Sequence, residues 1–511
     1  MLIKCYSAAL QGISASLVTI EIHAVSGADF SLVGLPDNAV KESRDRIRAA
    51  LLVNGYHLPV KRLTINMAPA DLKKEGSCYD LPLAIGMLHV AEELPAKHLE
   101  DYMMVGELSL DGTLQPIRGI LPIALCAKEN NFKGLILPAA NAREAAVVEG
   151  LDVIAADTLL DVIRHLSDIQ TIHPTQACLD DDLMQNAHTD DADFSDIRGQ
   201  QAVRRAMEVA AAGGHNMLMV GPPGAGKSML AKRLPTILPP LTLDEALETT
   251  KIHSVAGLLH NGQALVRQRP FRSPHHTITD VALIGGGQNP RPGEISLAHN
   301  GVLFLDEVPE YKRSVLEVMR QPLEDRKITV SRQKQTVDYP ASFMLVAAMN
   351  PCPCGHYGDP QHTCVCTPSQ IHRYKSRLSG PLLDRIDIHC SVQAVPYELL
   401  RSEQPGESSA VVRERVVKAR NIQQQRFAGT PIHCNAQMSA KQVRKYCRID
   451  EAGDKLLRNA MDKFGLSARA YDRILKVART IADLDGANDI TAVHLMEAIS
   501  YRQLDRDTWG E

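Results

Sequence analysis

Residues 221–228 read Gly-Pro-Pro-Gly-Ala-Gly-Lys-Ser, and they constrain the fold of the chain more than any other segment. They fit the phosphate-loop pattern G-x-x-x-x-G-K-S/T, with an apolar, strand-like run at 217–220 before them and a helix start at 229–232 after them. In such a loop, backbone N–H groups close on a polyphosphate, the lysine reaches the outer phosphates and the serine binds Mg2+. We therefore predict a site for ATP and Mg2+. The predicted nucleotide-binding residues are Gly221, Pro222, Pro223, Gly224, Ala225, Gly226, Lys227 and Ser228.

Length and composition exclude several classes of protein. The chain has 511 residues and 44% hydrophobic content, so we expect two to four domains. Its formal net charge of −4 gives no global attraction for a polyanion, so any nucleic-acid surface must be local. Because no apolar run is long enough to cross a bilayer and the first residues lack the layout of a signal peptide, we expect a cytoplasmic protein with no membrane partner. The 11 cysteines favour reduced thiols or metal ligands over a disulfide framework.

Residues 1–165 alternate short β-rich runs with helical runs, which predicts an α/β or α+β domain. Two stretches, 73–86 and 105–119, resemble the Lon-protease-type domain, which has a ribosomal S5 domain 2-like fold and a serine nucleophile activated by a lysine. The resemblance places Cys78 at the serine position and Ile123 at the lysine position. Isoleucine cannot accept a proton, and a lone cysteine is more often a small buried apolar residue than a nucleophile. We therefore expect a non-proteolytic domain that serves assembly or partner contact.

An acidic linker is predicted at 166–193. Between positions 168 and 193 the chain has seven Asp, no Lys or Arg and few large apolar side chains. Such a segment cannot bury enough apolar surface to fold by itself, so we expect a solvated spacer.

Two apolar runs after the phosphate loop end in polar residues. The run 301–305 is followed by Asp306 and Glu307, and the run 343–349 is followed by Asn350. The alternation of strands and helices here predicts a doubly wound parallel sheet, whose ligands bind beyond the carboxyl ends of the strands. Asp306 is expected to hold Mg2+ through water, and Glu307 to polarise the water that attacks the γ-phosphate. The site is therefore predicted to hydrolyse ATP.

The range 194–398 resembles the core of AAA+ ATPases, beginning with a segment that lies near the adenine in that family. This resemblance gives Asn350 the role of sensor 1, which senses the γ-phosphate. The segment 380–387 resembles one in MCM helicases and magnesium chelatase, where the arginine is a finger inserted into the neighbouring subunit's ATP site. It implies that Arg385 is catalytic in trans and that the protein is a homo-oligomer. The alternative interpretation places Arg385 in a surface salt bridge.

The C-terminal range 399–511 is predicted to form an α-helical lid domain. Within it, the segment 468–479 has apolar residues at helical spacing, with arginines off the apolar face. Its start resembles the sensor 2 helix of the same families, which implies a γ-phosphate contact for Arg469, with Arg473 as the second choice.

Two Gly- and Pro-rich segments, 269–277 and 285–293, indicate loops inserted into the core. The run 327–337 has the alternation of a β-hairpin with a basic tip. In AAA+ subfamilies such insertions face the central pore of a ring, where cationic side chains follow phosphates without reading bases. An alternative interpretation makes His275 and His276 of this loop metal ligands, but the sequence identifies no partner ligand for them. The expected DNA contacts are Arg269, Arg272, Arg332 and Lys334.

Two Cys-x-Cys pairs, separated by nine residues, lie in the loop after Asn350. Four thiolates at this spacing can close a tetrahedral Zn2+ site and fix the loop, so we predict a structural zinc. Two histidines inside the loop, His356 and His362, are alternative ligands. The four cysteines are Cys352, Cys354, Cys364 and Cys366.

Nearly the whole chain resembles the YifB/ComM family of magnesium-chelatase-like AAA+ proteins. Besides the Lon-like domain, the segments 299–307, 350–355 and 371–387 carry this resemblance. It implies a hexameric ring that hydrolyses ATP to drive branch migration of DNA during recombination in natural transformation, with recombination proteins as further partners. Spacing and composition alone predict only an oligomeric ATPase that threads or grips its substrate. Two alternatives remain: a chelatase-type motor that remodels a partner enzyme, and a nucleotide-gated protein-remodelling scaffold.

Overall fold

The computed structural model describes residues 2–502 apart from 28, 96–97, 177–191, 260–262, 288–289, 333–334, 360–361 and 396–405. Most of the predicted acidic linker and Lys334 lie outside these residues, and Arg332 is described for its backbone alone. The chain forms two compact units, Met1–Thr189 with Leu243–Val266 and Asp190–Thr242 with Arg267–Glu511. Among the described residues, no helix combines the length and the apolar character needed to cross a bilayer.

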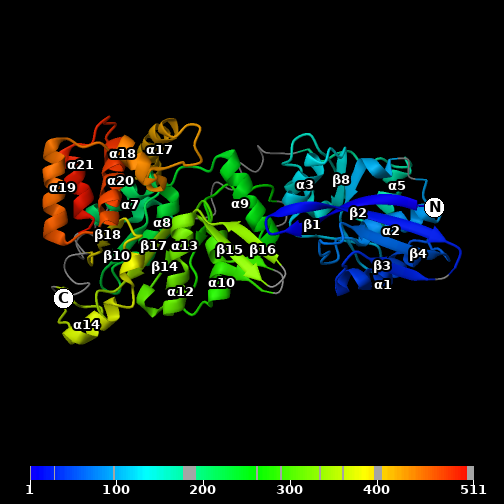
Figure 1. Ribbon diagram of the computed structural model, residues 1–511, viewed down its shortest axis with the longest axis horizontal. Helices are drawn as coiled ribbons and strands as arrows, with labels where there is room; N and C mark the ends of the chain where they lie inside the picture. The colour runs from blue at the N-terminus through cyan, green and yellow to red at the C-terminus, as the bar shows by residue number, and fades with distance from the viewer. Residues whose placement is uncertain are drawn as a thin grey trace. The chain divides into compact units, whose positions relative to one another are not determined.

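The first unit is built on a seven-stranded mixed sheet with the order β3-β4-β2-β1-β5-β8-β9 (Figure 1). The strand pairs β1/β2 and β2/β4 are antiparallel, and the remaining pairs are parallel. The strands of this sheet are β1 Leu2–Gln11, β2 Ser14–Val25, β3 Phe30–Val33, β4 Arg62–Ala68, β5 Tyr102–Met104, β8 Gly134–Pro138 and β9 Asp152–Ala156. The helices are α1 Asn38–Val53, α2 Asp80–Val90, α3 Ile120–Glu129, α4 Ala142–Ala145 and α5 Leu159–Leu166.

This sheet separates two apolar cores. Neighbouring residues of β8 belong to different cores, Ile136 to one and Leu135 to the other, because successive side chains of a strand point to opposite faces. Cys78 packs against the first core, and Ile123 lies buried in the second. Burial raises the pKa of the Cys78 thiol to about 12, so this sulfur is not an activated nucleophile. That this domain does not cleave peptides stays a prediction.

Helix α9 (Leu243–Ala256) folds as part of the first unit, although its sequence lies within the predicted range 194–398. The backbone N–H of Gly119, which precedes α3, donates to the carbonyl of Ser254 over 3.1 Å. The hydroxyl of Ser254 donates to the buried carboxylate of Glu144, which also accepts from the N–H of Leu121 over 2.9 Å. Burial raises the pKa of Glu144. The segment Leu243–Val266, which interrupts the sequence of the second unit, therefore completes the first unit.

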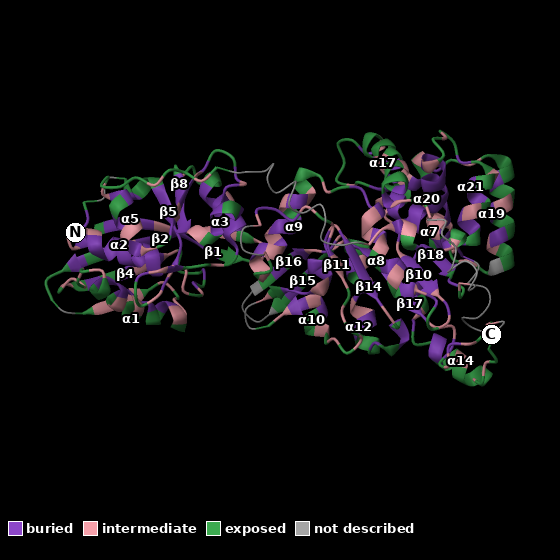
Figure 2. Ribbon diagram, turned by 180° about the vertical axis from the view of Figure 1, so that it is seen from behind, coloured by how far each residue is buried: buried purple, intermediate pink, exposed green. Residues whose placement is uncertain are grey.

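The second unit contains a five-stranded, all-parallel sheet with the order β11-β14-β17-β10-β18, as predicted for a doubly wound fold. Strands β14 and β17 are buried along their whole length (Figure 2), which explains their continuous apolar sequence. The strands are β10 Met217–Val220, β11 Phe271–Arg272, β14 Val302–Leu305, β17 Met344–Met349 and β18 Ile388–Ser391. The helices before the C-terminal region include α7 Gln201–Gly213, α8 Lys227–Ile237, α10 Asp280–Ile284, α12 Arg313–Val318, α13 Arg320–Asp325, α14 Pro368–Lys375 and α15 Gly380–Leu383.

The C-terminal region is helical, and its helices share one apolar core with the parallel sheet. Helix α20 packs between α7, α17 and α21, and its buried residues include Ile474, Val477 and Ile481. The predicted helical lid is thus part of the second compact unit. Its helices are α17 Ser409–Arg426, α18 Ala440–Tyr446, α19 Glu451–Phe464, α20 Ala468–Leu484 and α21 Ala492–Ser500.

The predicted hairpin is present as β15 (Lys327–Arg332) paired antiparallel with β16 (Gln335–Pro340). Within the predicted Gly-rich loop, two strands of two residues each, β12 (Gly285–Gly286) and β13 (Arg291–Pro292), pair antiparallel.

Candidate active site

The phosphate loop connects β10 to α8 and requires glycine at several of its positions. Gly224 and Gly226 have φ values of +78° and +86°, which L side chains rarely adopt. A Cβ on Gly221 would lie 2.1 Å from the carbonyl oxygen of Val392, so no larger residue fits there. The backbone is therefore shaped to turn tightly from the strand into the N-terminus of α8, where N–H groups bind anions.

Lys227 joins the loop to the end of β17. Its Nζ donates to the carbonyl oxygens of Gly221 (2.7 Å) and Pro222 (2.9 Å) and to Oδ1 of Asn350 (3.0 Å). The side chain is buried, and desolvation lowers the pKa of Lys227, while the charges of Asp306 and Glu307 act in the opposite direction. The predicted phosphate lysine and sensor 1 residue are therefore in direct contact.

Ser228 and Asp306 meet at the carboxyl edge of the sheet. The Ser228 hydroxyl donates to Oδ2 of Asp306 over 2.5 Å, although the two residues lie on different elements, α8 and the end of β14. One hydroxyl and one carboxylate at this separation are hard oxygen ligands that suit Mg2+, whose remaining ligands are usually phosphates and water. The two residues therefore fit the predicted magnesium site.

Glu307 has a strained backbone and a histidine neighbour. Its φ is +50°, an uncommon value for a residue other than glycine, and such residues cluster at active sites. Nδ1 of His276 lies 3.8 Å from its carboxylate, and the His276 ring contacts the rings of His275 (centroids 4.1 Å apart) and Tyr311 (6.4 Å). Neither histidine belongs to the groups of converging metal ligands found in the described part of the chain. Sequence reasoning missed this contact because it considered the histidines only as metal ligands.

Arg385 is held inside its own chain. Its Nη1 donates to the carbonyl of Pro381 over 2.5 Å, its Nη2 pairs with Glu324 at the C-terminal end of α13, and the residue is 6% exposed. Its Nε is buried and has no hydrogen-bond partner among the described residues. The structure thus contains an ion pair, as the alternative interpretation of Arg385 requires, but the arginine is buried rather than on the surface.

The two candidate sensor 2 residues differ in their surroundings. Arg469 lies in the first turn of α20 and is exposed. Arg473 pairs with the buried carboxylate of Asp387, which also lies 3.1 Å from Nδ1 of His215. Burial alone would raise the pKa of Asp387, but Arg473, His215 and Lys476 outweigh it and hold the pKa well below its usual range. Arg473 therefore ties the helical region to the end of the segment that carries Arg385.

Two of the four predicted DNA contacts are engaged within the second unit. Arg269 donates to the carbonyl oxygens of Pro239 over 2.6 Å and of Asn300 over 2.7 Å. Arg272 makes two hydrogen bonds of 2.7 Å to the carboxylate of Glu294. These contacts favour a structural role for both arginines over a role in binding phosphates. The remaining two, Arg332 and Lys334, stay predictions, because the side chain of Arg332 and the whole of Lys334 lie outside what the structure describes.

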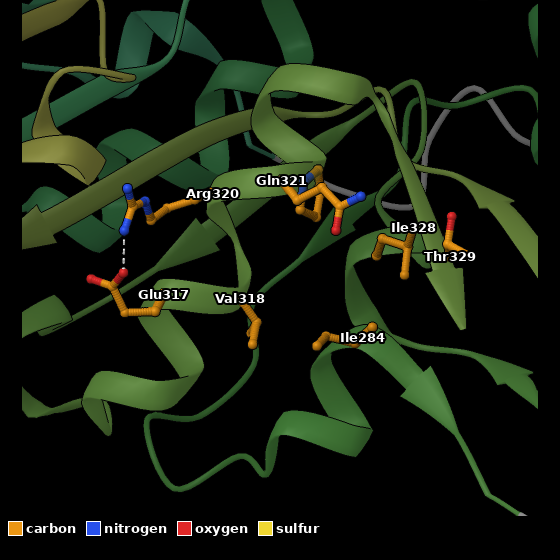
Figure 3. A pocket seen from close by; sticks show the side chains of 8 residues that line it. Ile284, Glu317, Val318, Arg320, Gln321, Ile328 and Thr329 are labelled. Carbon is orange, nitrogen blue, oxygen red and sulfur yellow. Dashed lines mark hydrogen bonds and ion pairs between the residues drawn. The ribbon is translucent and has the colours of Figure 1, made fainter. Parts of the chain in front are cut away.

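A cavity of about 360 Å³ lies at the base of the same hairpin and shares no residue with the phosphate loop (Figure 3). Glu317 and Arg320 form an ion pair at one side of it. The cavity is lined by Ile284, Glu317, Val318, Arg320, Gln321, Pro322, Ile328 and Thr329. The cavity therefore lies between α10, α12, α13 and β15, the first strand of the hairpin.

The four cysteines after Asn350 converge. Their sulfur atoms all lie within 4.8 Å of one another, as the two Cys-x-Cys pairs predict for a metal site. His356 and His362 form a separate group with Asp359, whose Oδ2 lies 3.3 Å and 2.9 Å from their Nδ1 atoms.

Comparisons of the sequence with known proteins show which family the chain belongs to. Residues 193–400 match the family described as magnesium chelatase, subunit ChlI, residues 20–141 match subunit ChlI of Mg-chelatase, and residues 406–502 match the ChlI C-terminal family. The chain is 46% identical over 506 residues to competence protein ComM of Haemophilus influenzae, covering 98% of this chain and 97% of that protein. It is 44% identical over 506 residues to the uncharacterized protein YifB of Escherichia coli, with the same shares. A shorter similarity, 26% over 171 residues and 30% of each chain, relates it to Lon protease 2 of Bacillus subtilis. The chain belongs to the YifB/ComM family of proteins with magnesium-chelatase-type AAA+ domains.

Proposed function

We propose that this protein is a ring-forming, ATP-dependent DNA motor, a helicase or branch-migration translocase that acts in homologous recombination during natural transformation. The observation that carries the ATPase part is the convergence of Lys227, Ser228, Asp306 and Asn350 at one edge of a parallel sheet. The DNA and recombination part is supported by the 46% identity to a protein named for competence.

Each residue of this edge has one task in hydrolysis. Backbone N–H groups of the loop and the ammonium of Lys227 bind and orient the phosphates. Ser228 and Asp306 would hold Mg2+, and the bound ion would neutralise charge that develops on the phosphate oxygens. Glu307 polarises the attacking water, and Asn350, already hydrogen-bonded to Lys227, positions that water against the γ-phosphate.

The site is completed by a second copy of the chain in this proposal. Arg385 stabilises the transferring phosphoryl group of a neighbouring subunit, in a ring that is hexameric by family resemblance. Its buried Nε, which has no partner among the described residues, supports a rearrangement of the guanidinium group when a phosphate becomes available. Arg469, exposed at the start of α20, is the proposed sensor 2 contact.

The DNA contact is assigned to Arg332, the last residue of β15, and to Lys334, which follows it in the sequence and lies outside the described residues. We expect branched or single-stranded DNA to stimulate ATP hydrolysis at low salt, where phosphate contacts are strongest. The double variant Arg332→Ala, Lys334→Ala is expected to lose this stimulation while basal hydrolysis persists. The matched control replaces Lys418 and Arg458, two exposed cations on helices α17 and α19, and is expected to keep it. Absence of any stimulation of the unmodified protein by DNA at low salt would contradict the DNA part of the proposal.

A chelatase-type motor that remodels a partner protein is the second candidate, because all three family matches are to magnesium chelatase subunits. It predicts hydrolysis that DNA leaves unchanged and that a protein partner stimulates. The same assay, with and without DNA, therefore separates the two candidates. A nucleotide-gated scaffold predicts ATP binding without DNA-stimulated turnover.

A further inference from the structure

The four-cysteine cluster (Cys352, Cys354, Cys364 and Cys366) brings all its sulfur atoms within 4.8 Å of one another, and the distances among the first three are those of a tetrahedral metal site. Cys352 Sγ lies 3.4 Å from Cys354 Sγ and 3.7 Å from Cys364 Sγ, and the last two sulfurs are 3.6 Å apart. A tetrahedron with Zn–S bonds of about 2.3 Å has edges of about 3.8 Å. These separations are much longer than the roughly 2.05 Å bond of a disulfide. The geometry thus resembles that of a structural zinc site with four thiolate ligands.

The backbone around the four-cysteine cluster is arranged as a turn that presents sulfur atoms. The N–H of Gly355 donates to the carbonyl of Cys352 over 3.0 Å, and Gly355 has a φ of +86°. The N–H of Tyr357 donates to Sγ of Cys352 over 3.3 Å, so the turn also orients this sulfur atom. The nearby histidines, His356 and His362, both contact Asp359 rather than the cysteine sulfurs. The four cysteines are therefore the ligands that we assign to the metal.

The same turn packs directly against the phosphate loop. A Cβ on Gly355 would lie 2.4 Å from Cδ of Pro223, so only glycine allows this approach. Two residues before the first cysteine, Asn350 accepts a hydrogen bond from Lys227. The four-cysteine cluster is therefore connected to the nucleotide site by packing on one side and by a short piece of backbone on the other.

We propose that the four-cysteine cluster binds one Zn2+ per chain and that this ion holds the turn at 352–355 against the phosphate loop. The ion is structural, because four thiolates fill its coordination sphere and leave no open position for water or substrate. Loss of the ion releases the turn, and with it the positions of Pro223 and Asn350. The effect of the ion on nucleotide affinity rests on the proposed function of the ATP site. Binding of the metal does not depend on that proposal.

Metal analysis of the full-length protein, purified under reducing conditions without chelator, tests the metal site. We expect one equivalent of zinc in the unmodified protein, in the His356→Ala, His362→Ala variant and in the Cys78→Ser control, and almost none in the Cys364→Ser, Cys366→Ser variant. Because the cysteine variant can fail to fold, the unmodified protein is also stripped and titrated with Co2+, which absorbs strongly in the visible when held by four thiolates. A reduced protein that holds no zinc and takes up neither Zn2+ nor Co2+, or one that loses zinc on histidine replacement, would overturn the proposal.

Binding of a fluorescent ATP analogue tests the coupling to the phosphate loop. The stripped, unmodified protein is expected to bind the analogue several-fold more weakly than the zinc-loaded protein, and to regain affinity when Zn2+ is returned. Equal affinity in both forms would refute the coupling. Metal content remains measurable even if the chain hydrolyses no ATP, so failure of this inference is distinct from failure of the proposed function.

Discussion

At the scale of single residues, the pair between Arg385 and Glu324 decides which of two roles the arginine has. Arg385 is buried, and its partner carboxylate is 49% exposed on α13. Because Glu324 is half exposed, water can hydrate its carboxylate when the phosphate of another subunit replaces it on Arg385, so the buried guanidinium keeps an anionic partner. A purely structural arginine would instead depend on Glu324 for its position.

Replacement of each partner separates these roles. Arg385→Ala is expected to lower the rate of ATP hydrolysis by roughly 10³-fold, because an arginine finger acts only in the transition state, and to leave ATP binding unchanged. Glu324→Gln is expected to retain hydrolysis, since it removes only the competing partner. Steady-state ATPase assays and analogue binding measure both effects. Unchanged hydrolysis in Arg385→Ala would show that the arginine serves only in the ion pair.

Short motifs predicted which polar residues meet at one edge of the sheet, because each residue follows directly on a strand or a loop whose position in a parallel sheet is fixed. The contacts Ser228–Asp306 and Lys227–Asn350 follow from that topology. The partner of Arg385 was not predictable, since it lies 61 positions away on a short helix with no distinguishing pattern. The structural use of Arg269 likewise depends on carbonyl groups, which no sequence pattern reveals.

At the scale of elements, helix α20 is attached to the sheet by a buried polar cluster. Asp387, which directly precedes β18, contacts Arg473 of α20 and His215 after α7, and Nε2 of His215 lies 2.8 Å from the hydroxyl of Thr480. The depressed pKa of Asp387 means that its ionised form stabilises the fold. This stabilisation is fully present above the unfolded-state pKa of about 3.9 and declines as the pH falls below it.

Asp387→Asn is therefore expected to destabilise the second unit by about 3 kcal/mol near neutral pH, because it leaves Arg473 without its buried partner. The difference from the unmodified protein is expected to narrow below about pH 4. Denaturant unfolding at several pH values measures this, with Lys418→Ala as a surface control that is expected to change little. A difference that stays constant down to about pH 3 would contradict the assigned pKa direction.

Sequence patterns predicted the parallel sheet and the β15–β16 hairpin, because strand length and alternation are local properties. They did not predict that α9 completes the first unit. Helical periodicity identifies an apolar face but not the core that receives it. The same limit applies to the C-terminal helices, which share the core of the sheet rather than forming their own.

At the scale of the whole molecule, the proposed motor depends on several copies of the chain. Each site is proposed to take Lys227 and Glu307 from one subunit and Arg385 from the next. A variant that lacks the loop lysine and a variant that lacks Arg385 should therefore complement each other. An oligomer built from either variant alone is not expected to hydrolyse ATP.

Mixing Lys227→Ala subunits with Arg385→Ala subunits tests this arrangement. Each variant alone is expected to be inactive, whereas mixed oligomers contain some sites with an intact loop and an intact arginine and should regain part of the hydrolysis. The measurement is the ATPase rate against mixing ratio, with light scattering to confirm assembly. Mixed oligomers that form but stay inactive would place Arg385 outside the neighbouring site.

The most direct test of the proposed function is the resolution of a labelled four-way DNA junction into duplexes by the full-length protein with ATP. We predict that duplex product accumulates with the unmodified protein and is absent with Glu307→Gln, which binds ATP but cannot polarise water. Hydrolysis of ATP in the presence of a junction that remains intact would contradict a DNA motor.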